Sequence, residues 1–463
     1  MALTVSLDDI VSGGNALLAI KPHWKRVRLG EVGQVLNGYA FKAELFTREG
    51  GTPLIRIRDV GSDASETFYT GDFDERYVVQ AGDLLIGMDG DFNCARWRGP
   101  LSLLNQRVCK VTVDESLYIP RFLDYALPGY LKAINDATSS ITVKHLSSRT
   151  IQDIPLPLPP MDEQREIVAE LEKQFSRLDE AVANLQRVKA NLKRYKASVL
   201  KAAVEGRLVE TEATQAHREG RAFETGEQLL QRILEERRAK WFSKGKYKEP
   251  LPAVTIDLPT LPEGWTWARL DNVAALKGGI TVDSKRQDPD ARAVPYLRVA
   301  NVQRGFIDLS EVKYINASEN DIADLRLESG DVLFNEGGDR DKLGRGWIWE
   351  GQLADCIHQN HVFRARLYLG AMSPKLVSWW GNTFGKDYFL RVGKQTTNLA
   401  SINLGKLSEF PVPVPPKAEQ LRMVAEIERL LSVVDEVEAE VNTNLKRAQA
   451  LRQATLAQAF GTT

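Results

Sequence analysis

The strongest constraint on how this 463-residue chain can fold is a long internal repeat. The segment WKRVRLGEVGQVLNG at Trp24 returns as WTWARLDNVAALKGG at Trp265, 241 residues later. The segment IPLPLPPMDEQREIVAELE returns as FPVPVPPKAEQLRMVAEIE, and from Pro155 and Pro411 the copies align without a gap to Ala459. A repeat of this length indicates that the chain contains two copies of one module.

The spacing between matching residues is not constant along the modules. It grows from 241 residues at Trp24 to 256 at Pro155, so insertions have accumulated between these points. The copies differ most over residues 60–108 and the matching part of the second copy. Because insertions collect in surface loops that carry function, the pattern indicates one framework that presents two different recognition surfaces.

Each module begins with a region of short alternating apolar runs. Residues 23–160 and 263–416 contain runs such as PLIRIRDV at 53–60, together with Gly-Asp turns. These patterns predict strands and turns, with helical stretches after Pro120 and Pro374. Both regions end in a PxPxPP run, which we expect to form a rigid hinge. The sequence therefore predicts two mixed α/β domains, one in each module.

After the prolines, both modules continue as an uninterrupted helical pattern. In residues 161–206 and 417–463, apolar residues recur at steps of three and four over more than four heptads, which is typical of a coiled coil. So narrow an apolar stripe needs a partner in water, and we expect the two arms to pack on each other. The predicted fold class is therefore α+β, with two mixed α/β domains joined by long coiled-coil helices.

Two segments lie outside this repeat. Residues 207–262 contain the run GEQLLQRILEERRAKWF, which predicts a central helix, and a basic, proline-containing linker into the second module. Residues 1–22 form an N-terminal extension to which the sequence assigns no role.

The composition restricts the classes of function. The 61 Lys and Arg residues balance 62 Asp and Glu residues, so DNA binding would have to come from local patches rather than from a global basic field. No apolar stretch approaches the roughly 18–20 residues of a membrane-spanning helix. Three widely spaced cysteines, Cys94, Cys109 and Cys356, fit a reducing compartment. We therefore expect a cytoplasmic protein without a membrane segment.

The sequence lacks the usual catalytic motifs. It contains no phosphate-binding loop, dinucleotide-binding turn or HExxH metal motif, and no [DN]PP[YF] tetrapeptide of amino-group DNA methyltransferases. The carboxylate pairs Asp89/Asp91 and Glu336/Asp339 lie in Gly-Asp turns, where a turn role is favoured over acid–base catalysis. The sequence therefore predicts no catalytic residue.

One cluster has a metal-like composition. Cys356, His358 and His361 offer a thiolate and two imidazoles, which are common zinc ligands. The first copy has Ser102, Leu104 and Arg107 at the matching positions, and a fourth ligand is missing. A structural role is therefore favoured, and we expect no metal site.

Three signatures together resemble the specificity subunits of type I restriction-modification enzymes. They are PLPPMDEQREIVAELE with LKAAVEGRL, the central LLQRILEERRAKW, and PVPPKAEQLRMVAEIE with LAQAF. The resemblance covers nearly the whole chain. It implies the α+β fold class in full: two pseudo-symmetric mixed α/β target recognition domains, at 23–160 and 263–416, joined by long antiparallel coiled-coil helices that set their separation.

The resemblance also implies the partners and cofactors. The chain would be non-catalytic, read an asymmetric bipartite site in double-stranded DNA, and dock two methyltransferase subunits and ATP-driven restriction subunits. S-adenosylmethionine, ATP and Mg²⁺ would belong to those subunits, and no cofactor to this chain.

DNA-contacting residues are predicted from their type and position. Guanidinium, ammonium, amide and hydroxyl side chains on loops read bases or hold phosphates. In the divergent segments the candidates are Asn93, Arg96, Arg98, Arg340, Lys342 and Arg345, and before the proline runs they are Thr142, Lys144, Thr397 and Asn398. For each of these residues a solvated loop role is the alternative.

A second function remains open at this point. The chain could be a coiled-coil scaffold with duplicated protein-binding domains. Such a scaffold would show no sequence-dependent affinity for DNA.

Overall fold

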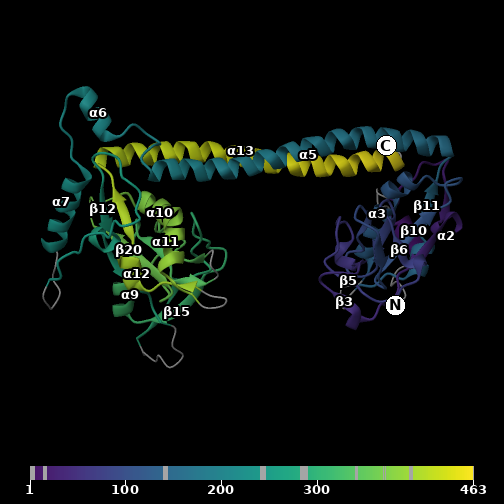
Figure 1. The fold of residues 1–463 in the computed structure, drawn as a ribbon, viewed down its shortest axis with the longest axis horizontal. Coiled ribbons are helices and arrows are strands. Elements are labelled where there is room, and N and C mark those ends of the chain that lie inside the picture. The colour runs from purple at the N-terminus through teal and green to yellow at the C-terminus, as the bar shows by residue number, and fades with distance from the viewer. Residues whose placement is uncertain are drawn as a thin grey trace. The chain divides into compact units, whose positions relative to one another are not determined.

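The computed structural model describes residues 6–13, 18–138, 144–239, 247–281, 290–338, 342–368, 370, 372–395 and 400–461. The chain divides into two compact units (Figure 1). The first comprises Met1–Arg187 with Val441–Thr463, and the second comprises Val188–Glu440. Each unit therefore contains one mixed α/β domain together with a stretch of each long helix.

The domain of the first unit is built of short strands with one long helix. Its elements are α1 (Leu7–Ser12), β1 (Lys25–Arg28), α2 (Leu29–Val32), β2 (Gly33–Asn37), β3 (Phe46–Thr47), β4 (Thr52–Ile55), β5 (Phe68–Tyr69), β6 (Val78–Val79), β7 (Leu84–Gly87), β8 (Cys94–Arg96), β9 (Ser102–Leu104), β10 (Val108–Val113), α3 (Pro120–Ala137), α4 (Ser148–Gln152) and β11 (Pro155–Leu158). The strands form a four-stranded sheet in the order β2-β10-β7-β8, a five-stranded sheet in the order β3-β5-β4-β9-β6, and the pair β1-β11.

The domain of the second unit repeats this plan. Its elements are β12 (Thr266–Arg269), α8 (Leu270–Val273), β13 (Ala274–Lys277), β14 (Arg292–Leu297), β15 (Lys313–Ala317), α9 (Glu319–Leu325), β16 (Val332–Asn335), β17 (Gly337–Gly338), β18 (Gly346–Ile348), β19 (Ile357–His358), β20 (Val362–Leu367), α10 (Pro374–Asn382), α11 (Phe384–Val392), β21 (Lys394–Gln395), β22 (Ala400–Ser401), α12 (Leu404–Ser408) and β23 (Pro411–Val414). The sheet β13-β20-β16-β18 matches β2-β10-β7-β8, and the pair β12-β23 matches β1-β11. Two further sheets have the orders β15-β14-β19 and β17-β22-β21.

The proline runs form strands, and the expected hinge was wrong. Pro155 and Pro157 lie in β11, which pairs antiparallel with β1 at the start of the same module. Pro411 and Pro413 lie in β23, which pairs with β12 in the same register. Each proline strand pairs with only one other strand. Its other side, where the prolines offer no backbone N–H, therefore needs no hydrogen-bond partner. The prolines therefore join the end of each domain to its beginning.

The packing of the first unit explains the N-terminal extension. Phe122 and Leu127 of α3 are fully buried in a core that also contains Trp24, from the start of the repeat, and Phe460, from the end of the chain. Leu18 of the extension is 1% exposed in the same core, and apolar residues of α1 pack against it. The described part of the extension therefore contributes to the first domain's core.

The two long helices confirm the antiparallel pair. The helices α5 (Met161–Val204) and α13 (Lys417–Phe460) have 44 residues each, about 66 Å at 1.5 Å per residue. In the first unit Arg452 contacts Asp179 at 2.5 Å, and in the second Lys196 contacts Asp435 at 3.2 Å. Lys196 follows Asp179 along α5, whereas its contact Asp435 precedes Arg452 along α13. The two helices therefore run in opposite directions.

The apolar seam of α13 has the expected heptad spacing. Ile427, Val434, Val441 and Ala448 are all buried and recur every seven residues. Between the two modules, the described residues form two shorter helices, α6 (Glu212–Glu219) and α7 (Gly226–Ala239). The predicted central helix corresponds to α7, whose Leu229 and Ile233 are buried in the core of the second domain.

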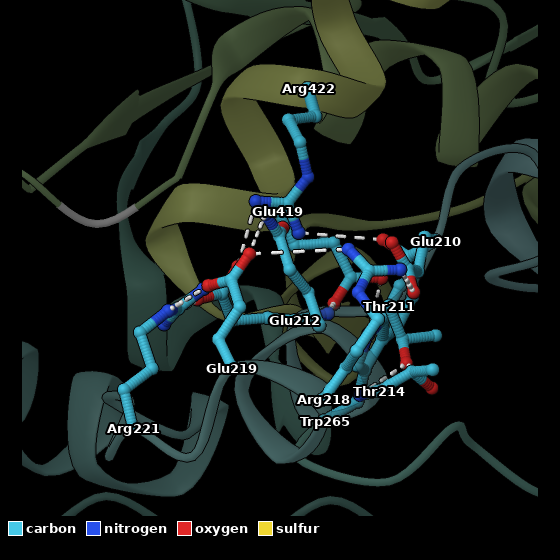
Figure 2. A network of polar contacts seen from close by, with 11 residues as sticks. Glu210, Thr211, Glu212, Thr214, Arg218, Glu219, Arg221, Trp265, Glu419 and Arg422 are labelled. Atoms are coloured by element: carbon cyan, nitrogen blue, oxygen red, sulfur yellow. Dashed lines mark hydrogen bonds and ion pairs between the residues drawn. The ribbon is translucent and has the colours of Figure 1, made fainter.

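Repeated polar contacts join each long helix to its domain. The indole N–H of Trp24 donates to Glu163 at 2.9 Å, and that of Trp265 donates to Glu419 at 3.0 Å. Glu419 also accepts from the Glu212 backbone N–H at 2.8 Å, in the network that Figure 2 shows. These contacts explain why both modules repeat a tryptophan at the start and a glutamate after the prolines.

Glu212 connects α6 to the start of α13. Its side chain is 3% exposed and binds Arg221 at 2.6 Å and Arg422 at 2.7 Å (Figure 2). Two guanidinium partners compensate a buried carboxylate for its lost hydration. Burial tends to raise the pKa of Glu212, but the contacts from Arg221 and Arg422 outweigh it and lower the pKa.

Candidate nucleic-acid interface

In the first unit, three segments that are far apart in sequence meet at one edge of the domain. They are residues 88–90 after β7, residues 105–107 between β9 and β10, and residues 144–146. The Met88 N–H donates to the Arg107 carbonyl at 2.9 Å, and the Leu146 N–H donates to the Met88 carbonyl at 2.7 Å. We refer to these three segments as the first edge.

The second unit contains the matching arrangement. Its segments are residues 336–338, 359–361 and 400–402. The Glu336 N–H donates to the His361 carbonyl at 2.9 Å, and the Ile402 N–H donates to the Glu336 carbonyl at 2.8 Å. We refer to these segments as the second edge. Both units therefore use the same backbone hydrogen bonds to bring the same three parts of the module together.

The turn in the middle of each edge has the same backbone structure. In the first edge, the Gln106 N–H donates to the Tyr39 carbonyl at 2.9 Å. In the second edge, the Asn360 N–H donates to the Ile280 carbonyl at 2.9 Å. The turn is thus fixed to the segment that follows the first strand of the four-stranded sheet.

A repeated glycine permits this attachment. Gly38 and Gly279 occupy matching positions after β2 and β13. A Cβ atom on Gly38 would lie less than 3.0 Å from the Asn105 carbonyl oxygen, and one on Gly279 equally close to the His358 carbonyl oxygen. Only a residue without a side chain allows the backbones to approach so closely.

Each edge holds one carboxylate against a basic side chain. In the first edge Asp89 lies 2.6 Å from Nδ1 of His145 and 3.5 Å from Nε of Arg107. In the second edge Glu336 contacts Nδ1 of His361. The two carboxylates come from the turns considered above for acid–base catalysis. Here their contacts orient the basic side chains of the edge.

Three amide side chains of the two turns, those of Gln106, Gln359 and Asn360, are at least partly exposed, whereas Asn105 Oδ1 accepts from the Gln106 N–H at 2.7 Å. Gln106 is exposed, and Gln359 and Asn360 are partly exposed. Among the described residues, none of these three amide groups has a hydrogen-bond partner. Each edge therefore presents unused donors and acceptors beside one or two basic side chains.

The structure places some predicted residues at or near the first edge. Lys144 lies in the edge, and its ammonium group donates to the carbonyl of Asn135 at 2.7 Å. Asn93 is exposed in the loop between β7 and β8. Arg98 is also exposed and pairs with Asp63 at 2.8 Å. The predicted residues Thr142, Arg340, Thr397 and Asn398 lie outside the described residues.

Two predicted arginines have partners within the protein. Arg96 donates to Asp124 of α3 at 2.7 Å and to two backbone carbonyls, so it fixes β8 to that helix. Arg345 is 9% exposed and donates to the Val299 carbonyl at 3.2 Å. Lys342 is partly exposed in the same loop after β16. Both arginines have a structural role, and contact with DNA stays a prediction for all three residues.

The sequence reasoning missed the residues of the turns. Gln106 and Arg107 in the first edge match Asn360 and His361 in the second, at a constant spacing of 254 residues. Insertions mark the segments where the spacing between the copies changes, and this turn contains no insertion. The signal in the sequence is that Gln106-Arg107 in one copy stands where the other copy has Asn360-His361, in a turn whose flanking strands align without a gap.

The metal-like cluster of the second domain is divided between different environments. Burial raises the pKa of Cys356 to about 12 and lowers the pKa of His358 to about 4. Nδ1 of His358 lies 2.7 Å from the Val362 carbonyl, whereas His361 is half-exposed and contacts Glu336. The neutral thiol and imidazole are therefore core groups.

Neither a metal centre nor a membrane segment is found in the part of the chain that the structure describes. There, no group of three or more His, Cys, Asp or Glu side chains is placed to hold a metal ion. The helices of that part also lack the combination of length and apolar character needed to cross a membrane.

Comparisons with known proteins agree on one family. The family model described as the type I restriction modification DNA specificity domain matches residues 22–193. The type I restriction enzyme EcoBI specificity subunit of Escherichia coli is 34% identical over 458 residues, covering 96% of this chain and 87% of that protein. The EcoKI specificity subunit of Escherichia coli K12 is 21% identical over 454 residues, covering 94% and 88%.

The fold is shared as well. A solved chain, from work on complex assembly and conformational transition of the type I R-M system, aligns with a TM-score of 0.62 at 18% identity and covers 96% of this chain and 99% of that one. The 34% identity with the EcoBI subunit, over 96% of this chain, shows that the chain belongs to the family of type I restriction enzyme specificity subunits.

Proposed function

We propose that this chain reads an asymmetric bipartite site in double-stranded DNA, one half with each recognition domain, and that the two edges face the base pairs. The observation that carries this proposal is the pair of edges, which have the same backbone hydrogen bonds but different side chains. Two edges with the same backbone structure but different exposed side chains suit a DNA site whose two halves have different sequences. Base readout needs such groups on the protein surface, held in fixed positions.

The long helices would fix the distance between the two half-sites. An α-helix rises 1.5 Å per residue, so adding one turn to both helices should change the separation of the readers by about 5.4 Å. That distance corresponds to one to two base pairs of DNA. The spacer of the recognised site would then change in steps that follow the helix length.

The proposed role includes the assembly of an enzyme from several subunits. The helices would dock two methyltransferase subunits, and restriction subunits would join this complex. S-adenosylmethionine, ATP and Mg²⁺ would bind to those partners, while this chain carries no catalytic group and acts in the cytoplasm. The purified chain alone should therefore transfer no methyl group to DNA, and turnover by the chain alone would contradict the proposal.

The decisive experiment maps N6-methyladenine across the genome of the source cells with and without this gene. We expect one bipartite motif to lose methylation in the deletion strain and to regain it on complementation. An unchanged methylation pattern, together with equal affinity of the chain for unrelated DNA sequences, would instead favour the scaffold with duplicated protein-binding domains.

A further inference from the structure

We infer that two adjacent residues in each turn, Gln106 with Arg107 and Asn360 with His361, determine which bases each half-site must contain. The inference rests on the function proposed above and assigns its specificity to named side chains. These residues occupy the same two places in the first and second edges.

The first argument is that the backbone of the turn does not differ between the domains. The carbonyl of Asn105 accepts from the Val108 N–H at 2.8 Å, and the carbonyl of Gln359 accepts from the Val362 N–H at 2.8 Å. The turn is also fixed on its other side by the repeated glycine. Side chains at matching positions therefore leave the two frames from the same place, and only their chemistry differs.

The second argument is the chemistry of the exchanged groups. Gln106 is replaced by Asn360, and both amides can pair with the N6 and N7 groups of adenine. Arg107 is replaced by His361, and a guanidinium can pair with the O6 and N7 atoms of guanine, whereas a neutral imidazole has one N–H donor and one acceptor nitrogen. Both pairs of residues can form hydrogen bonds with bases, but the side chains differ in length and in the arrangement of their donors and acceptors. Such a change alters sequence preference.

The third argument is that the two amides have no partner in the described part of the chain and that the two basic side chains are largely exposed. The amides of Gln106 and Asn360 have no partner among the described residues. Arg107 and His361 have side chains that are 56% and 54% exposed, each beside one carboxylate that sets its orientation. These polar atoms are therefore accessible to base edges.

The test exchanges the two turns between the domains. One variant carries Gln106→Asn with Arg107→His, and the reciprocal variant carries Asn360→Gln with His361→Arg. Each variant takes its residues from the matching turn of the same protein, so we expect both to fold. The controls are Gln80→Asn and Asn316→Gln, which alter exposed amide residues outside the edges.

All proteins would be purified in complex with their methyltransferase subunits, and methylation would be measured on a DNA library with both half-sites randomised. For each turn variant we expect a drop of about tenfold to a hundredfold at the original sequence of one half-site, with a new preference there. The other half-site and both control variants should keep the original preference. Melting temperatures of the complexes would verify folding.

The possible failures are distinguishable. If the unaltered complex methylates no bipartite motif, the proposed function itself is wrong. If it does, but a folded turn variant keeps the original preference, specificity lies elsewhere and the inference is overturned. An equal loss of binding to cognate and non-cognate DNA would also overturn it, because that is the result expected of phosphate contacts.

Discussion

Replacing Gln164 with alanine should weaken the attachment of the long helix to the first domain. Gln164 is completely buried near the start of α5. Its side chain accepts from the Ile119 N–H at 2.8 Å and donates to the carbonyls of Leu117 at 3.1 Å and Pro159 at 3.0 Å. At about 1 kcal/mol for each hydrogen bond, Gln164→Ala should destabilise the first unit by about 3 kcal/mol.

The matching glutamine of the second module, Gln420, makes one hydrogen bond fewer and so provides a comparison. Gln420 has the same position and is 1% exposed, but its side chain has two backbone partners, the Ser373 N–H and the Pro415 carbonyl, both at 3.0 Å. Gln420→Ala should therefore cost about 2 kcal/mol. Gln174→Ala is the control, because Gln174 is exposed on α5 and its change should stay within about 0.5 kcal/mol.

Calorimetry would resolve these differences. For units of roughly 200 residues, each kcal/mol shifts the melting temperature by about 2–4 °C, so we expect a shift of roughly 6–12 °C for Gln164→Ala and less for Gln420→Ala. If Gln164→Ala melted at the temperature of Gln174→Ala, the backbone contacts of Gln164 would not be what attaches the helix, and the reasoning would fail.

Three further predictions concern single positions. Burial lowers the pKa of His358 from 6.5 to about 4, so the folding stability of the protein should fall as the pH falls from about 6.5 toward 4. In the variant His358→Leu this pH-dependent loss should be smaller by roughly 2–3 kcal/mol, measured by urea denaturation at pH 7.5 and 4.5. Gly279→Ala should destabilise the second unit by about 2 kcal/mol through its clash with the His358 carbonyl, whereas Gly278→Ala, whose Cβ would meet nothing within 4 Å, should leave the melting temperature nearly unchanged. Burial tends to raise the pKa of Glu163, but hydrogen bonds from Lys21, Trp24 and His23 outweigh it and lower the pKa. Glu163→Gln should therefore lower the melting temperature at pH 7. In parallel melting curves, the difference between the variant and the unaltered protein should disappear as the pH falls below about 4.5.

The duplication made the framework predictable from sequence. The matching of Trp24 with Trp265 and of Pro155 with Pro411 required two similar domains, and the heptads at Val434 and its neighbours required a helical partner. These features are repeated along the chain, so periodicity and alignment report them directly. The structure adds the reason for the matches, since each tryptophan binds the glutamate that follows the prolines of its own module.

Other features depended on contacts that no local pattern contains. The prolines were expected to form a hinge, because a PxPxPP run by itself favours an extended, unpaired segment. Its pairing with β1 or β12 is set by residues more than a hundred positions away. The role of the N-terminal extension also became apparent only from the burial of Leu18 beside Trp24.

The turn between β9 and β10 shows why reading groups are harder to find than frames. Exposed residues usually change stability by no more than about 0.5 kcal/mol, so Gln106 and Arg107 can be exchanged at little cost to folding. A change at Gly38 would force backbone atoms apart and cost several times as much. A chain duplicated in this way would therefore keep the glycine and vary the exposed pair. Positions that matter most for sequence discrimination would thus leave no insertion, no strong hydrophobic pattern and no effect on the fold, and their signature is a change of polar residue type on an unchanged turn.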